Sequence, residues 1–232
     1  MTLEISPVDG IPEVRAGDDL AALIAAAAPA LRDGDVLVVT QKVVSKAEGA
    51  MVRIDAEDPR GHKAIVEDQS VRIVRRRGDL IISETRHGFV CANAGVDLSN
   101  VDEGWAALLP EDSDRSARRI RDALRARLGV EVAVIVSDTF GRPWRRGLTD
   151  VAIGCAGIRA VVDLRGTEDS RGRVLQVTEV CVVDELAGAA ELVMGKATGT
   201  AAAIIRGVDP SWLGRGEVHA EVVRPPEEDL FR

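Results

Sequence analysis

The feature that most constrains this fold is the continuous apolar run Val132–Val136, which the polar tripeptide Ser137–Thr139 follows at once. Such a run is typical of a strand that is buried on both faces of a sheet. Gly141 and Pro143 oppose its continuation, so we predict that the strand ends at Ser137–Thr139. In open α/β sheets, ligands bind just beyond the carboxyl ends of strands. The sequence therefore predicts a ligand site at this strand end.

The remaining segments indicate an α/β (mixed α+β) chain with mixed sheets and flanking helices. A second buried strand is predicted at 35–40, and polar residues follow it at 41–49. Helices are predicted at 20–28, from a start within 110–113 to the terminating Gly129, and from the cap Asp184 to Met194. Residues 149–158 form a small, apolar segment. Further strands are predicted at 2–8, 52–54, 80–83, 88–94, 160–164, 173–183, 202–205 and 218–223.

Composition and charge narrow the classes of function. The formal net charge of −8 argues against nucleic-acid binding by bulk electrostatics. The three cysteines are widely spaced and form no C-x-x-C pair, which predicts buried thiols in a reducing compartment. The sequence shows neither a charged-then-apolar leader nor an apolar run of membrane-spanning length. We therefore expect a cytoplasmic protein with no membrane partner.

Two acidic residues from distant segments are candidate metal ligands. Asp97 and Asp138 could share a divalent ion if the fold brings them together, and Thr139 adds another hard oxygen. Lys46 would suit a phosphate as a point charge. Three arginines offer forked donors for phosphate or carboxylate: Arg142, Arg145 and Arg146. The alternative is a strand end capped by a polar turn, with a solvated basic patch.

Three motifs in order carry a family resemblance. Residues 38–49, 91–97 and 137–145 are similar to the coenzyme F420-0:L-glutamate ligase family, including the amino-terminal ligase domain of the two-domain actinobacterial enzyme. The similarity spans nearly the whole chain. We predict one ligase domain over residues 1–232, with a division into two subdomains left open, and a tail or linker at 224–232.

The resemblance implies a GTP-dependent enzyme of coenzyme F420 biosynthesis, forming GDP and phosphate. It would join L-glutamate to the terminal carboxylate of F420-0, or of its dehydro form, through an acyl phosphate. Addition of further γ-linked glutamates is left open. The resemblance also implies a family-specific α/β fold, an interlocked homodimer, two Mg²⁺ or Mn²⁺ ions, K⁺, and GTP as co-substrate.

The resemblance also assigns roles to individual residues. Lys196 stands where archaeal members contribute an acidic or amide side chain, so water or another residue would complete the shell of a second ion. As catalytic residues we predict Lys46, Asp138 and Arg142. The implied metal ligands are Asp97, Asp138 and Thr139, and the implied nucleotide contacts are Ile11, Pro12, Glu13, Val14, Gln41, Lys46 and Asn100.

Two other functions would use the same residues. One is a metal-dependent GTP phosphotransferase or hydrolase that needs no amine acceptor. The other is a noncatalytic nucleotide-binding subunit. A ligase differs from both because its release of phosphate requires both the coenzyme precursor and glutamate.

Overall fold

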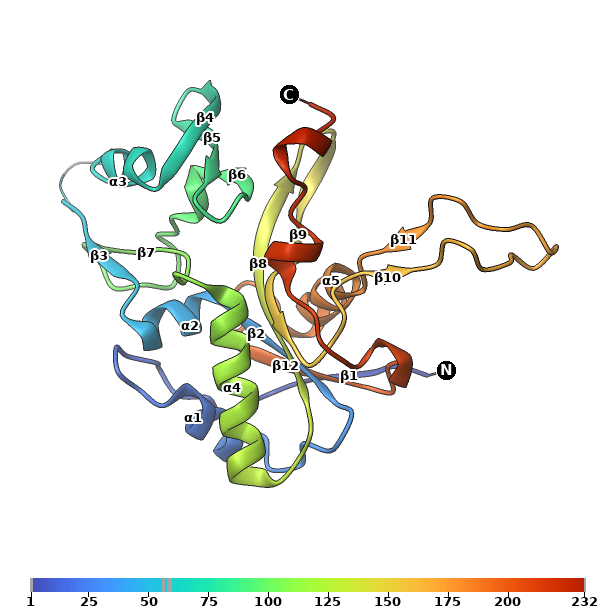
Figure 1. Cartoon of the computed structure of the whole chain (residues 1–232). Helices are drawn as coiled ribbons and strands as arrows, with labels where there is room; N and C mark the ends of the chain where they lie inside the picture. Colours follow the sequence, from blue (N-terminus) through green and yellow to red (C-terminus); the bar gives the residue numbers. More distant parts are fainter. Residues whose placement is uncertain (1, 56, 58–59, 232) are drawn as a thin grey trace.

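A computed structural model describes residues 2–55, 57 and 60–231 of the chain, and a five-stranded sheet lies at its centre (Figure 1). β2 and β8 run parallel, whereas the other neighbouring strands are antiparallel. β2 ends opposite Ser137 and passes directly into α2 (Gln41–Glu48). The strand order is β1 (Glu4–Pro7), β12 (Ala202–Arg206), β2 (Val36–Thr40), β8 (Ala133–Arg142) and β9 (Arg145–Ala156).

Both faces of this sheet are covered, as the apolar run predicts. Side chains alternate along β8, so Val134 and Val136 join the core beneath α1 (Leu20–Ala27) and α4 (Ser113–Leu128). Ala133 and Ile135 join the opposite core, which α5 (Val182–Met194) covers. The prediction of a strand buried on both faces is confirmed.

The predicted end of that strand is wrong. β8 continues from Ser137 to Arg142, because the antiparallel strand β9 pairs with it along this length. The register shifts between Val136 and Ser137 and again between Gly141 and Arg142, while Gly141 itself pairs with Leu148. Pro143 lies in the turn that joins the two strands. The apolar segment at 149–158 is therefore mostly part of β9.

Three other predictions need correction. Residues 218–223 do not form a strand, because Val218–Glu221 is the short helix α6. Asp184 does not cap α5, which begins two residues earlier; its carboxylate accepts a hydrogen bond from the Ala152 backbone N–H at 2.9 Å. The predicted strands 160–164 and 173–183 are shorter in the structure, where they are β10 (Val162–Asp163) and β11 (Glu179–Val180), which pair with each other.

A smaller unit packs beside the central sheet and carries the 97–100 loop. It contains a two-stranded and a three-stranded sheet, around a core that includes Val66, Ile81 and Ala106. The Arg75–Arg77 run lies on its exposed edge strand, β4. Its elements are β3 (Met51–Arg53), α3 (Lys63–Asp68), β4 (Ser70–Arg77), β5 (Leu80–Thr85), β6 (Val90–Ala92), the 3₁₀ helix η1 (Asn93–Gly95) and β7 (Trp105–Ala107).

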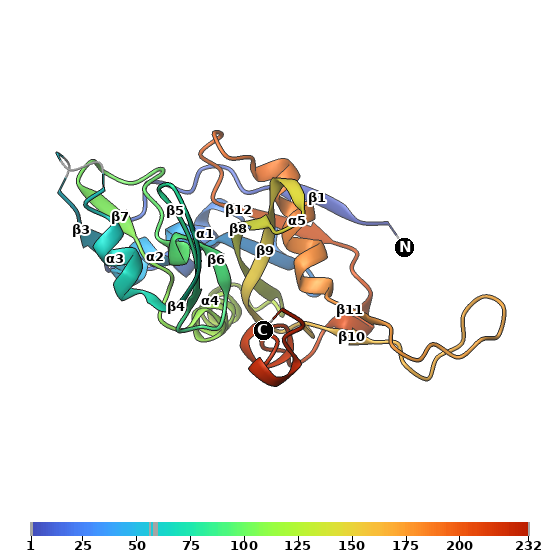
Figure 2. The ribbon, with the colours of Figure 1, turned by 90° about the horizontal axis from the view of Figure 1, so that it is seen from above.

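An arm formed by residues 162–180 projects away from the body of the protein, with β10 and β11 at its base (Figures 1 and 2). After β12, the chain forms η2 (Pro210–Trp212), α6 and η3 (Pro226–Glu228). The ring of Phe231 lies 4.8 Å from that of Trp144, at the tip of the β8–β9 hairpin.

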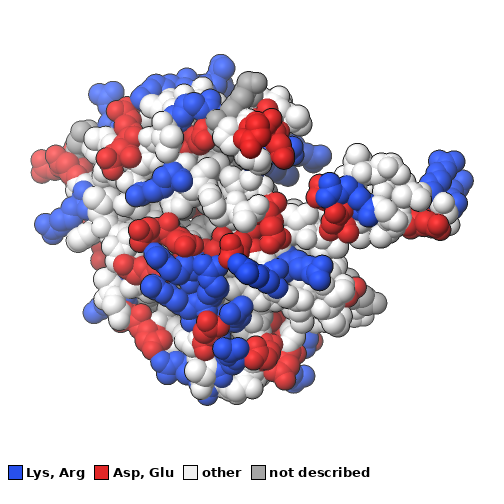
Figure 3. Space-filling model, viewed as in Figure 1, with Lys and Arg blue, Asp and Glu red and all other residues white. Residues whose placement is uncertain are grey.

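Basic side chains gather over α4 (Figure 3), whose arginines alternate with a buried stripe that includes Ile120 and Leu124. Cys91 and Cys155 are buried free thiols, as predicted, and Cys181 is half-buried. In the part of the chain that the structure describes, no helix is both long and apolar enough to cross a membrane.

Candidate active site

A cavity of about 420 Å³ lies where β2 ends. It forms because β8 extends past the end of β2. Beyond Ser137, no strand among the described residues pairs with β8 in parallel, and the chain of β2 turns into α2. The cavity lies at the predicted position beside Ser137–Thr139, although the strand that ends there is β2. The cavity is lined by Glu13, Thr40, Gln41, Lys42, Val43, Lys46, Asp97, Ser99, Asn100, Ser137, Asp138, Thr139, Asp150, Glu191, Gly195, Lys196, Gly199, Thr200 and Ala201.

The amino-terminal end of α2 supplies the positive side of the cavity. Thr40 has extended backbone geometry, and its side chain does not cap the helix, so the first-turn N–H groups remain available to an anion. Lys46, one turn further along, has a side chain that is 14% exposed and pairs with the carboxylate of Glu13. A helix terminus and a shielded ammonium are suitable donors for phosphate oxygens.

Gln41 fixes the orientation of this helix. It is buried, and its amide donates to the Leu108 carbonyl at 2.8 Å. The hydroxyl of Ser45 donates to the same carbonyl at 2.6 Å. These bonds tie α2 to the residues that follow β7, and β7 in turn pairs with Asp97 through Ala107.

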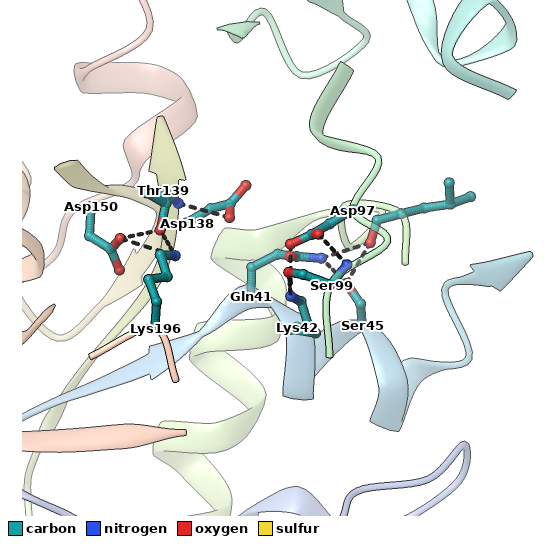
Figure 4. A network of polar contacts seen from close by, with 10 residues as sticks. Gln41, Lys42, Ser45, Asp97, Ser99, Asp138, Thr139, Asp150 and Lys196 are labelled. Carbon is teal, nitrogen blue, oxygen red and sulfur yellow. Dashed lines mark hydrogen bonds and ion pairs between the residues drawn. The ribbon is translucent and has the colours of Figure 1, made fainter. Parts of the chain in front are cut away.

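Asp97 lies opposite α2 and is held by two contacts (Figure 4). Its carboxylate receives Lys42 Nζ at 2.7 Å and the Ser99 backbone N–H at 2.7 Å, while Lys42 also donates to Ser99 Oγ at 2.7 Å. Burial alone would raise the pKa of Asp97, but the hydrogen bonds from Lys42 and Ser99 outweigh it and lower the pKa. Asp97 is therefore a preformed anion.

Asp138 has the opposite character. Burial, together with the charges of Asp97 and Asp150, raises its pKa to about 7, although the Thr139 N–H and Lys196 oppose the change. The Thr139 N–H donates to Asp138 Oδ1 at 2.8 Å. A cation bound here would stabilise the ionised form of this second carboxylate, whose charge the protein compensates poorly.

Asp150 completes the acidic group from β9, and its exposed fraction is 3%. It accepts hydrogen bonds from Ser137 Oγ at 3.1 Å and from Thr139 Oγ1. Lys196, from the loop after α5, donates to Thr139 Oγ1 and lies 3.8 Å from Asp150 Oδ1 (Figure 4).

The donor set fits a hard divalent ion that shares its shell with phosphate. Among the described residues, no group of three or more Asp, Glu, His or Cys side chains is arranged to hold a metal by itself. Mg²⁺ commonly binds through one or two carboxylates, with water and substrate phosphates completing its shell. Asp97, Asp138 and Thr139 offer such a partial shell beside the phosphate-binding end of α2.

The structure gathers most of the residues predicted from the sequence, but not all of them. Pro12 is exposed, Ile11 packs against the main core, and Val14 is buried in it, so their side chains do not line the cavity. Arg142 also lies outside it: at the end of β8, it donates to the Arg146 carbonyl at 3.1 Å. Those that do line the cavity are Glu13, Gln41, Lys46, Asp97, Asn100, Asp138 and Thr139.

Sequence reasoning missed two acids and a lysine of the cavity wall. Asp150 stands in a segment described as small and apolar, where a lone carboxylate is itself a signal. Glu191 lies on the last turns of α5, and burial followed by the charge of Asp150 raises its pKa. Lys42 lies within a predicted motif, but its contact with Asp97 joins segments far apart in sequence.

Comparison with known proteins shows the family of this chain. A model of the F420-0:Gamma-glutamyl ligase family matches residues 10–207, which include the whole cavity wall. The chain belongs to the F420-0:Gamma-glutamyl ligase family. It is 47% identical to the coenzyme F420:L-glutamate ligase of Methanopyrus kandleri, covering 100% of this chain and 98% of that protein. It is 44% identical to the protein of that name from Methanothermobacter thermautotrophicus, over 100% of both chains.

A third relative, the coenzyme F420:L-glutamate ligase of Archaeoglobus fulgidus, is 38% identical over 100% of this chain and 97% of its own. A larger depression of about 780 Å³ lies between α4 and the 213–217 segment. Two charged groups at that depression, Arg118 and Glu217, already pair with each other at 3.0 Å.

Proposed function

We propose that this protein is a GTP-dependent ligase that joins L-glutamate to the terminal carboxylate of coenzyme F420-0 or its dehydro form. The observation that carries the proposal is that one cavity combines an uncapped helix terminus and Lys46 with the acids Asp97 and Asp138. Family membership supplies the acceptor and the amino acid. The cavity supplies what a nucleoside triphosphate needs, namely donors for its phosphates and ligands for its counterion.

The chemistry requires that a carboxylate be activated. An ionised carboxylate does not accept an amine at neutral pH, because its oxygen is a poor leaving group. We propose that the acceptor carboxylate attacks the γ-phosphorus of GTP, which breaks the bond to the β-phosphate oxygen and releases GDP. The glutamate amine then attacks the acyl phosphate, forms the amide, and expels inorganic phosphate with loss of a proton.

The residues of this chain would bind and orient the reactants. The α2 terminus and Lys46 would hold the triphosphate and offset the charge that develops during transfer. Gln41 and Asn100, with the 11–14 backbone, would hold the rest of the nucleotide. Much of the acceleration would come from positioning, which can contribute roughly 7–11 kcal/mol.

Asp97, Asp138 and Thr139 would hold Mg²⁺ or Mn²⁺, and two such ions are proposed from the family resemblance. When bound, a divalent ion neutralises phosphate charge and polarises the phosphoryl group. K⁺ is proposed on the same basis. Lys196 is a cation and cannot be a ligand, so a second ion would need water or another residue to complete its shell.

We also propose a cytoplasmic homodimer. The arm at 162–180 supports this association, because Val177 is 85% exposed and Val174 is 49% exposed on a segment that projects from the body (Figure 2). An extended hairpin with apolar residues is suited to contact a second copy. Light scattering should give a mass close to twice 24.7 kDa.

The reaction is tested by mass spectrometry of products formed from GTP, Mg²⁺ or Mn²⁺, L-glutamate and F420-0. The expected product is F420-0 extended by glutamate, with one phosphate released per amide bond. Phosphate release should require both F420-0 and glutamate. Release without either would indicate a hydrolase or phosphotransferase, and no turnover with the full mixture would indicate a noncatalytic nucleotide-binding protein.

A further inference from the structure

We propose that Asp150 is a positioning residue, which turns the hydroxyl oxygen of Thr139 toward the cavity so that it can ligate the divalent ion. This inference rests on the proposed function, because it concerns the ion of that same site. It adds a residue that acts through its neighbour, Thr139.

The fold makes Asp150 a fixed partner of Thr139. The two residues are directly opposite each other in the antiparallel β8–β9 ladder, so their side chains lie on the same face. Asp150 is 3% exposed, whereas a solvated carboxylate would be free to turn away. Ser137, two residues before Thr139 on the same face, donates to the other carboxylate oxygen at 3.1 Å and fixes its rotation.

The hydrogen bond to Asp150 determines what the Thr139 oxygen can do. A hydroxyl has one proton and two lone pairs. Because Thr139 gives its proton to Asp150 Oδ1, both lone pairs remain to accept from a donor or a cation. The structure shows this acceptor state in use, because the ammonium of Lys196 donates to Thr139 Oγ1 (Figure 4).

Asp150 is itself poorly placed to be a ligand. One of its oxygens receives Ser137, and the other receives Thr139 with Lys196 3.8 Å away. Lys196, by contrast, can leave when an ion binds, since its side chain is 61% exposed. Without Asp150, the Thr139 hydroxyl would rotate freely and could direct its proton at the incoming ion. Partners that orient metal ligands in this way are typically worth 10–100-fold in metal affinity.

The test is a double-mutant cycle on Mn²⁺ binding to the metal-free protein, read by electron paramagnetic resonance of free Mn²⁺ without substrates. Asp150→Ala should weaken Mn²⁺ binding by about 10–100-fold. In a Thr139→Val background, the same change should cost less than about 3-fold, because the group it orients is already gone. Asp122→Ala is the matched control, since it removes a carboxylate that is 50% exposed, pairs with Arg121 and lies outside the cavity, and it should retain affinity within about 3-fold.

Two results would overturn the inference. If Asp150→Ala weakens binding equally in both backgrounds, Asp150 acts through its charge or as a ligand. If it has no effect in the wild-type background, it plays no part in ion binding. Thermal unfolding of each variant checks that it folds. If Asp150→Ala is unstable, Asp150→Asn takes its place: it keeps the shape and one acceptor oxygen, and it should bind Mn²⁺ with an affinity between those of the wild type and a variant without the acceptor. A wild-type protein that makes the amide product, with Mn²⁺ affinity that Asp150→Ala leaves unchanged, contradicts this inference alone, whereas failure to make the product contradicts the proposed function.

Discussion

Asp138→Asn should stabilise the metal-free protein at alkaline pH while removing its affinity for metal. Burial, and next the charges of Asp97 and Asp150, raise the pKa of Asp138 to about 7. The metal-free fold must therefore ionise this carboxyl at a cost when the pH is above neutral. Asparagine removes that cost and can still accept the hydrogen bond that the Thr139 N–H donates at 2.8 Å.

The magnitude follows from the pKa. A rise from 3.8 to about 7 corresponds to roughly 4 kcal/mol at most. Because the folded-state pKa lies above the unfolded one, the folded state binds the proton more tightly. The free energy of unfolding therefore falls as pH rises from about 4 to about 7. Allowing for relaxation and water entry, we expect Asp138→Asn to gain about 1–3 kcal/mol at pH 8 and less at pH 5.

The assay is urea denaturation in the presence of EDTA at pH 5 and pH 8. Asp122→Asn is the control, because Asp122 is 50% exposed and pairs with Arg121 on the surface, so it should change stability by less than about 0.5 kcal/mol. Added Mn²⁺ should stabilise the wild-type protein and not the Asp138 variant. A variant no more stable than wild type at pH 8, or a gain that does not grow between pH 5 and pH 8, would refute the reasoning.

Three further predictions concern nucleotide binding, pH and packing. Lys46→Ala should weaken GTP binding at least about 10-fold by calorimetry, since it removes the shielded ammonium beside the α2 terminus; unchanged affinity would exclude Lys46 from the phosphate site. Burial, with the charge of Arg86, lowers the pKa of His87, so the stability of the wild-type protein should fall as the pH drops below about 6.5. His87→Gln should lessen that fall, as measured by thermal unfolding between about pH 5 and pH 7.5. Gly154→Ala should cost about 1–3 kcal/mol or more in urea denaturation, because its Cβ would lie 2.3 Å from the Ser113 carbonyl carbon. Gly141→Ala, whose Cβ would meet Leu148 at an ordinary 3.9 Å, should cost less; equal losses would contradict the packing argument.

The parts of the fold that depend on local pattern were predictable. The Val132–Val136 run indicates a doubly buried strand because every position is apolar, and the amphipathic stripe of α4 ends at Gly129, which adopts left-handed geometry. The end of β8 was not predictable in this way. A glycine ends a strand only when no neighbouring strand supplies hydrogen bonds, and β9 supplies them.

The candidate site was likewise predictable only in part. Asp138 and Thr139 were visible as polar residues after an apolar run, and Asp97 as an acid in a turn-rich loop. Their convergence depends on β8 extending past the end of β2, which is a property of strand pairing rather than of either segment. Asp150 was missed because its significance lies in its register with Thr139 across the hairpin. Lys42 was missed because its partner, Asp97, comes from the smaller unit.

The most direct test of the central claim is anomalous diffraction from crystals grown with Mn²⁺ and GTP. The account predicts a manganese peak within coordination distance of the carboxylates of Asp97 and Asp138, with phosphate oxygens in its shell and the triphosphate at the amino-terminal end of α2. A manganese ion that contacts GTP but neither aspartate, or a nucleotide bound outside this cavity, would contradict it.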